Sequence, residues 1–174
     1  MKPIIRSAAV LAAAVLVPVA FAQAPVPTPP PAHKMYMAND IKWQDTPSLP
    51  GAKISVLEGP MNEAKPFMAR IKLPANYKIA PHWHPAIEHV TVISGAFAMG
   101  TGEKWDDKGL HTLGPGDVMI MQPKTPHYAL AKGETVVQIH GVGPWSVNYV
   151  NAADDPTKKG DAKKAEPKKD EKKK

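Results

Sequence analysis

The amino-acid sequence predicts an all-β domain, and three observations support this prediction. Several short runs are rich in β-branched or apolar residues, and clusters of turn-forming residues separate them. No stretch keeps the apolar period of about 3.6 residues that an amphipathic helix would show. Many short strands at such spacing are typical of a sandwich or a barrel. We therefore expect one β domain, extending from residue 34 to residue 151.

The start of the chain has the composition of a secretory signal peptide. A short basic segment precedes an apolar stretch from Ala8 to Ala20, and small residues at Ala20 and Ala22 offer a cleavage site. The apolar stretch is shorter than the roughly 20 residues that cross a bilayer, so an uncleaved membrane anchor is the weaker alternative. We expect residues 1–22 to be removed, and the mature protein to be periplasmic or secreted, with no segment that spans a membrane.

After the expected signal peptide, the sequence predicts a proline-rich spacer and then a series of short strands. Residues 23–33 contain five prolines and predict an extended spacer. The expected strands are residues 54–57, 67–73, 89–93, 117–121 and 135–140. Each gap between them contains Gly, Pro or Asn, at residues 58–60, 74–76, 94–95, 114–116 and 132–134. These residue types supply the backbone conformations of tight turns.

The end of the chain is rich in lysine. Residues 152–174 hold no large apolar side chain and are expected to be disordered, because they cannot bury enough surface to offset the entropy of ordering. Residues 158–174 carry a net charge of +5, whereas residues 23–157 carry −1. The nearly neutral domain argues against a nucleic-acid partner. The tail either contacts anionic polymers of the cell envelope or is a solubilising charge run.

Four residues have the chemistry and spacing of a metal site. His82 and His84 are two residues apart, so both point to one face of a strand. Glu88 opens the next run after a bend at Pro85, and His127 lies on a separate expected strand. The chain has no cysteine, which excludes thiolate ligands and cysteine nucleophiles. Three imidazoles and one carboxylate suit one divalent ion per chain, which could be Mn, Fe, Ni, Cu or Zn.

These residues resemble the two sequence motifs of the cupin superfamily. The first motif, Gly-x5-His-x-His-x3-4-Glu-x6-Gly, is met by His82, His84, Glu88 and Gly95, with Asn76 replacing the first glycine. Asparagine tolerates a positive φ, so the turn can be kept. In the second motif, Gly-x5-Pro-x-Gly-x2-His-x3-Asn, Gly116 and His127 match, while Gln122, Lys124 and Ala131 differ. The resemblance implies a jelly-roll β-barrel with all four ligand positions filled. A looser resemblance over residues 43–150 is to the cupin domain of zinc-binding anti-sigma factors.

The resemblance admits several functions. Small cupins include dioxygenases, decarboxylases and isomerases, so one hypothesis is a metal-dependent oxidoreductase of the dioxygenase type that acts on a small organic molecule. The alternative is a non-catalytic protein of the cell envelope that binds a metal or a small molecule. His140 is the one candidate for a catalytic base, and the pattern leaves open whether its strand face lines the barrel or faces outward. A homodimer paired through sheet edges is also compatible with the family.

Overall fold

The structure is a computed structural model that describes residues 33–158. The expected signal peptide, most of the expected spacer and residues 159–174 of the tail lie outside the described residues. The chain divides into two compact units, residues 1–35 and residues 36–174. Of the first unit only residues 33–35 are described, and these are exposed and without regular secondary structure. Residues 36–158 are the described part of the second unit.

The regular secondary structure of this part is mostly β, as predicted. Its strands are β1 (Gln44–Asp45), β2 (Lys53–Glu58), β3 (Pro66–Leu73), β4 (Tyr77–Trp83), β5 (Glu88–Ser94), β6 (Phe97–Thr101), β7 (His111–Leu113), β8 (Val118–Met121), β9 (His127–Ala131), β10 (Thr135–Val142) and β11 (Asn148–Tyr149). Short 3-10 turns occur at η1 (Ala38–Asp40), η2 (Asp107–Gly109) and η3 (Ala152–Asp154). None of the helical segments between residues 33 and 158 has the length and hydropathy needed to cross a membrane.

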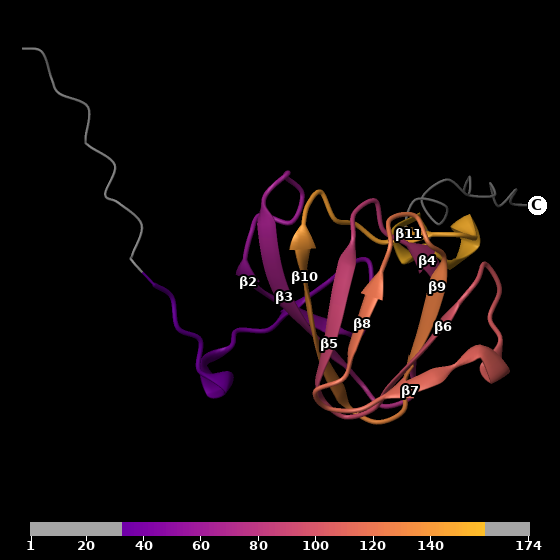
Figure 1. Cartoon of the computed structure of the whole chain (residues 1–174), viewed down its shortest axis with the longest axis horizontal. Helices are drawn as coiled ribbons and strands as arrows, with labels where there is room; N and C mark the ends of the chain where they lie inside the picture. The colour runs from indigo at the N-terminus through magenta and orange to yellow at the C-terminus, as the bar shows by residue number, and fades with distance from the viewer. Residues whose placement is uncertain (1–32, 159–174) are drawn as a thin grey trace, which may run out of the picture. The chain divides into compact units, whose positions relative to one another are not determined.

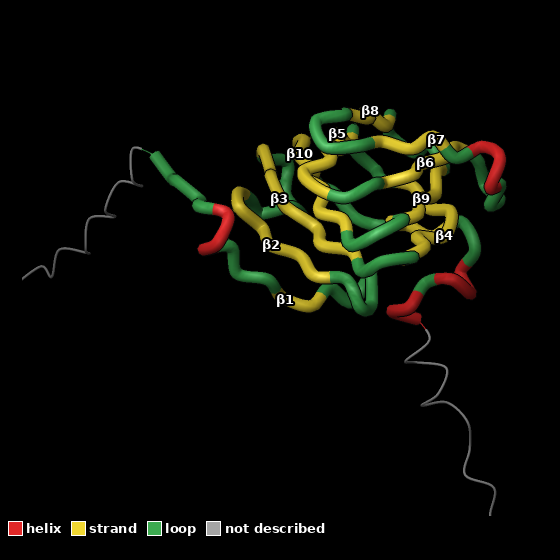
Figure 2. Tube along the Cα trace, turned by 90° about the horizontal axis from the view of Figure 1, so that it is seen from below, coloured by secondary structure: helices red, strands yellow, loops and turns green. Residues whose placement is uncertain are grey.

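The strands form two antiparallel sheets (Figures 1 and 2). The six-stranded sheet has the order β1-β2-β3-β10-β5-β8, and the five-stranded sheet has the order β11-β4-β9-β6-β7. Most neighbours are distant in sequence: β10 lies between β3 and β5, and β9 lies between β4 and β6. The two sheets form the jelly-roll barrel that the sequence resemblance implied.

The core lies between the sheets. Burial alternates along β3 and along β10, so that every second side chain points inward. Phe67, Ala69 and Ile71 on β3 and Val137 and Ile139 on β10 belong to one continuous apolar cluster. This cluster surrounds the position where the candidate ligands meet.

Two motif positions show why the turns accept these residues. Asn76 has φ 61°, so asparagine does adopt the left-handed conformation that replaces the expected glycine. Gly95 has φ 85°, and a Cβ there would collide with the backbone of Glu134 and Thr135. Glycine is therefore required at residue 95 both by backbone conformation and by the close approach of the β9–β10 turn.

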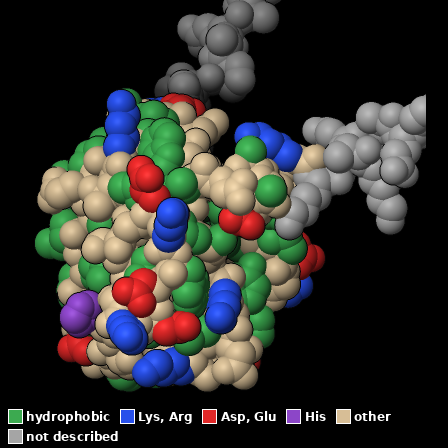
Figure 3. Space-filling view, turned by 90° about the vertical axis from the view of Figure 1, so that its right-hand side faces the viewer, with side chains coloured by type: hydrophobic (Ala, Val, Ile, Leu, Met, Phe, Trp, Pro, Cys, Tyr) green, Lys and Arg blue, Asp and Glu red, His purple; other side chains and the backbone are tan. Residues whose placement is uncertain are grey.

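The surface of this domain mixes charges of both signs. On the face shown in Figure 3, lysine, arginine and acidic side chains alternate over short distances. This pattern agrees with the nearly neutral net charge of residues 23–157.

Candidate metal centre

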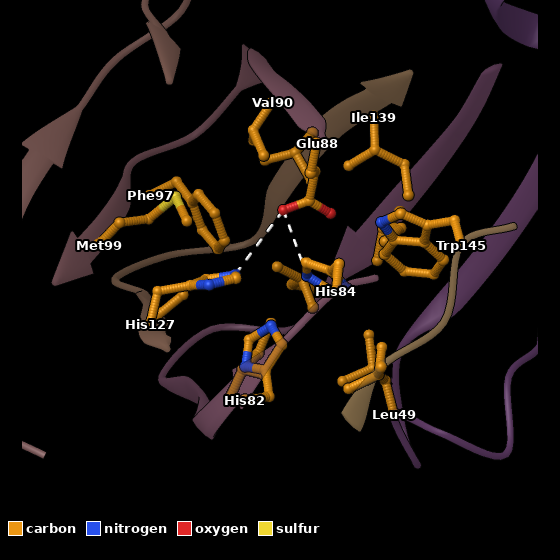
Figure 4. Close-up of a pocket in the computed structure, with 16 residues that line it drawn as sticks. Leu49, His82, His84, Glu88, Val90, Phe97, Met99, His127, Ile139 and Trp145 are labelled. Carbon is orange, nitrogen blue, oxygen red and sulfur yellow. Dashed lines mark ion pairs between the residues drawn. The ribbon is translucent and has the colours of Figure 1, made fainter. Parts of the chain in front are cut away.

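The four predicted ligands come from both sheets. His82 lies on β4, His84 follows the end of β4, and His127 begins β9 in the same sheet. Glu88 begins β5 in the opposite sheet. All four side chains are buried and line one pocket inside the barrel (Figure 4). The structure therefore brings together the residues that the sequence spacing indicated.

Local backbone structure aims the histidines inward. The pairing of β4 with β9 shifts register between Ile79 and His82, next to Pro81, which has no N–H to donate. Beyond this irregularity His82 lies opposite His127. His84, two residues further, points to the same side as His82.

Each imidazole is fixed by a hydrogen bond from its outer nitrogen. Nδ1 of His82 donates to the carbonyl oxygen of Ala80 at 2.8 Å, and Nδ1 of His127 donates to that of Thr125 at 2.9 Å. Nδ1 of His84 donates to the carbonyl of Ser146 at 2.8 Å. Because a carbonyl can only accept, Nδ1 carries a proton, and in the neutral ring Nε2 then presents its lone pair. This arrangement orients histidine ligands in metal sites.

The distances between the ligand atoms suit a common ion. One nitrogen from each of His82, His84 and His127 lies within 4.8 Å of the others, so the three could hold a metal ion. Oε2 of Glu88 lies 3.4 Å from Nε2 of His84 and 3.7 Å from Nε2 of His127. Two ligand atoms that each lie about 2.1 Å from one ion are roughly 3.0–3.5 Å apart. The two distances from Glu88 are close to this range, whereas the three imidazole nitrogens, which lie within 4.8 Å of one another, would approach one another further around an ion.

The burial of the histidine nitrogens provides a second test of whether a metal ion fits this site. Nε2 of His84 and Nε2 of His127 are buried and have no hydrogen-bond partner among the described residues. Buried nitrogens without a partner are costly and call for an explanation. A divalent ion at the centre of the group would satisfy both atoms, so the residues present fit such an ion.

The electrostatics of the pocket favour the uncharged imidazole. Burial lowers the pKa of His82 well below its ordinary value, and repulsion from His127 and His84 lowers it further. Burial also lowers the pKa of His127, although its bond to Thr125 and the charge of Glu88 oppose this shift. Neutral imidazole is the form that binds metal.

The wall of the pocket contains a residue that the sequence did not reveal. The indole ring of Trp145 is stacked on the His84 imidazole, with centroids 4.6 Å apart and planes inclined by 17°. The next residue, Ser146, accepts the His84 hydrogen bond. The segment between β10 and β11 thus holds His84 in place. No periodicity or motif in the sequence marks this contact.

His140, the candidate base, lies outside the pocket. It follows Ile139 on β10. Because neighbouring side chains on a strand point to opposite faces, Ile139 points into the barrel and His140 points to the outer face of the sheet. Its cross-strand partner is His89, and the two rings are stacked 4.7 Å apart. His140 does not line the pocket. The alternation of side chains along β10 answers the question that the sequence left open and places His140 on the outer face of the sheet.

The fold and this site define a small jelly-roll barrel whose interior could hold a metal ion. A family model described as "Cupin domain" matches residues 69–142, and together with the fold this match supports the cupin superfamily for this chain. The sequence matched no curated protein.

Solved structures of the same fold accompany this match. The polyketide cyclase RemF from Streptomyces resistomycificus is 18% identical over 74% of this chain and 93% of its own, with a TM-score of 0.58. KdgF from Halomonas sp. is 19% identical over 63% of this chain and 95% of its own, with a TM-score of 0.50. The structure of Rhodobacter sphaeroides SigE in complex with the anti-sigma ChrR is 17% identical over 60% of this chain and 50% of that chain, with a TM-score of 0.46. At these identities the likeness shows the fold alone.

Proposed function

We propose that this protein is a metal-binding cupin in which His82, His84, Glu88 and His127 hold one divalent ion beside a site for a small organic molecule. The observation that carries the proposal is the shared orientation of the three imidazoles. Each donates through Nδ1 to a backbone carbonyl, which leaves Nε2 free to face the interior. Three nitrogens and one oxygen suit Mn, Fe, Ni, Cu or Zn and do not select among them.

The chemistry of the pocket limits the class of reaction. A divalent ion held there would supply Lewis-acid or redox chemistry. Apart from the four proposed ligands, the described residues that line the pocket include no side chain able to accept a proton. The protein itself would orient the organic molecule and exclude water from it. This combination favours a dioxygenase-type oxidoreductase, which relies on the ion rather than on a protein base.

The same lack of a base supports a second candidate function. A protein that only binds a metal or a small molecule needs no proton acceptor. Metal analysis of the purified protein, followed by oxygen uptake measured after loading with each candidate ion, separates the two functions. Uptake that depends on an organic substrate and is lost in His84→Ala supports the enzyme. His111→Ala is the matched control, because His111 is exposed on β7.

We also propose that the protein acts in the periplasm or outside the cell. The composition of residues 1–22 supports this proposal. Mass spectrometry of the protein from its native host should give a mature N-terminus at Gln23. An intact Met1 on the exported protein, or retention in the cytoplasm, contradicts it.

A further inference from the structure

The indole nitrogen of Trp145 is a hydrogen-bond donor for which the described part of the chain offers no acceptor. Nε1 is buried and has no partner among the described residues. The ring is held firmly, because it stacks on His84 and lies 6.1 Å from the ring of Phe67. Its own backbone N–H donates to the carbonyl of Met61 at 2.7 Å. A buried indole N–H normally finds an acceptor, and residues 33–158 supply none.

The donor lies in the wall of the pocket that holds the three histidines. Trp145 lines that pocket together with Glu88 and Ile139. Figure 4 shows the indole nitrogen on the side of the ring that faces Glu88. An oxygen of a molecule bound beside the proposed ion could therefore accept a hydrogen bond from this N–H.

The remaining lining restricts what such a molecule can be. Apart from the four proposed ligands and Trp145, the described lining consists of aliphatic residues, Phe97 and Met99. It contains no lysine, arginine, hydroxyl or amide side chain. A second charge on the molecule would be buried without a partner, which is costly. The cavity that this lining encloses is small, so the molecule is also small.

We propose that Trp145 binds the ligand of this site, donating from Nε1 to an oxygen of a small molecule with one anionic or carbonyl head and an apolar body. The proposal rests on the proposed metal centre, because the ion holds the head. The ligand class therefore excludes phosphorylated molecules, sugars and dicarboxylates, whose additional polar groups find no partner in this lining.

The test uses the full chain loaded with Co²⁺, whose visible absorption reports on both the metal and its ligands. Metal affinity is measured first, and butyrate and succinate are then titrated as matched probes of equal chain length. Butyrate should bind at least tenfold more tightly than succinate. Trp145→Phe keeps an aromatic ring on His84 but removes the N–H. A hydrogen bond to a charged group contributes about 1.5–3 kcal/mol, so this variant should weaken butyrate binding roughly 10- to 100-fold.

Two controls separate binding from structure. Trp105→Phe removes an indole N–H that donates to Asp107 at 2.8 Å on the surface, and it should bind butyrate like the wild type. Trp145→Phe should bind Co²⁺ with an affinity within threefold of the wild type. Unchanged butyrate affinity in Trp145→Phe, or a loss of its Co²⁺ affinity, overturns the proposed role. Succinate binding as tight as butyrate, or no butyrate binding at all, overturns the proposed ligand class.

A wild-type measurement covers the case in which Trp145→Phe does not fold. In the Zn²⁺-loaded protein labelled with ¹⁵N, butyrate should shift the indole N–H resonance of Trp145 more than those of the other three tryptophans. Phe variants of Trp43, Trp83 and Trp105 assign the resonances. An unmoved Trp145 signal overturns the inference. Failure of the wild type to bind any divalent ion appears before a probe is added, and it overturns the metal centre itself.

Discussion

His82 on β4 and His127 on β9 are cross-strand partners, and their ring centroids lie 4.3 Å apart inside the barrel. Both rings are buried, and burial lowers the pKa of each. Two uncharged imidazoles thus face one another from adjacent strands. Their Nδ1 atoms are already bonded to backbone carbonyls, so the site is organised before an ion binds.

We predict that a divalent ion stabilises the folded domain and that His127→Ala abolishes this gain. Binding to the native state alone adds about 2.7 kcal/mol when the ion exceeds its Kd a hundredfold. Thermal melts of protein with added Zn²⁺ and with a chelator measure the difference. His111→Ala should keep the gain, because His111 is exposed. Equal melting temperatures, when metal analysis shows that Zn²⁺ was bound, would count against this prediction.

The two motif glycines should differ in their tolerance of a side chain. Gly95 and Gly116 both have a positive φ, 85° and 92°. A Cβ on Gly95 collides with the backbone of Glu134 and Thr135, whereas a Cβ on Gly116 meets nothing within 4 Å. Gly116→Ala should cost about 1–2 kcal/mol for its left-handed conformation alone. Gly95→Ala should cost at least about 2 kcal/mol more. Urea unfolding of both variants measures this, and equal costs would refute the steric argument.

Tyr149 should make stability depend on alkaline pH. Its hydroxyl donates to the carbonyl of Ser48 at 2.8 Å, and burial together with nearby acidic groups raises its pKa to about 12. The unfolded tyrosine has a pKa near 10. Because the folded state keeps the proton longer, this contribution is complete below pH ~10 and is lost as the pH rises toward 12.

The measurement compares wild type and Tyr149→Phe in urea at pH 8 and at the highest pH at which both remain folded. The wild type should lose more stability than the variant between the two conditions. Parallel losses would show that Tyr149 does not titrate as proposed.

The lysine-rich tail should not contribute to the stability of the barrel. Residues 159–174 contain no large apolar residue that could pack on the domain. A chain that ends at Lys158 should keep the melting temperature of the full chain within about 2 °C, a shift well below the 4–8 °C expected per kcal/mol in a small domain. A larger drop would mean that the tail binds the folded domain.

The apolar runs of the sequence predicted strands of one sheet, whereas in the other sheet strands were expected only at His82 and at His127, as part of the metal motif. The five apolar runs that were expected to be strands correspond to β2, β3, β5, β8 and β10, which lie in the six-stranded sheet. These strands are rich in Val and Ile, and their alternation of buried and exposed positions is local information.

The five-stranded sheet has no such pattern. β6 reads Phe-Ala-Met-Gly-Thr and β9 reads His-Tyr-Ala-Leu-Ala, and Ala and Gly have low intrinsic preference for strands. β4 contains Pro81, which weakens a strand assignment. These segments become strands because they pair with one another across the barrel. Pairing of β4 with β9 joins residues about fifty positions apart, and no local pattern encodes it.

The same division holds for the site. The spacing of His82, His84 and Glu88 is a local property, so the sequence by itself determined these candidate ligands, and the second motif added His127. Only the tertiary structure decided that His140 lies outside the barrel and that Trp145 lies on His84. Which face of β10 points into the barrel is set by the pairing of β10 with β3 and β5 in the six-stranded sheet. Trp145 contacts His84 because the chain after β10 runs back past the end of β4, where β11 pairs with β4. The two residues are 61 positions apart in the sequence. Such contacts arise from the packing of distant strands, whereas a ligand pair two residues apart needs only the alternation of a single strand.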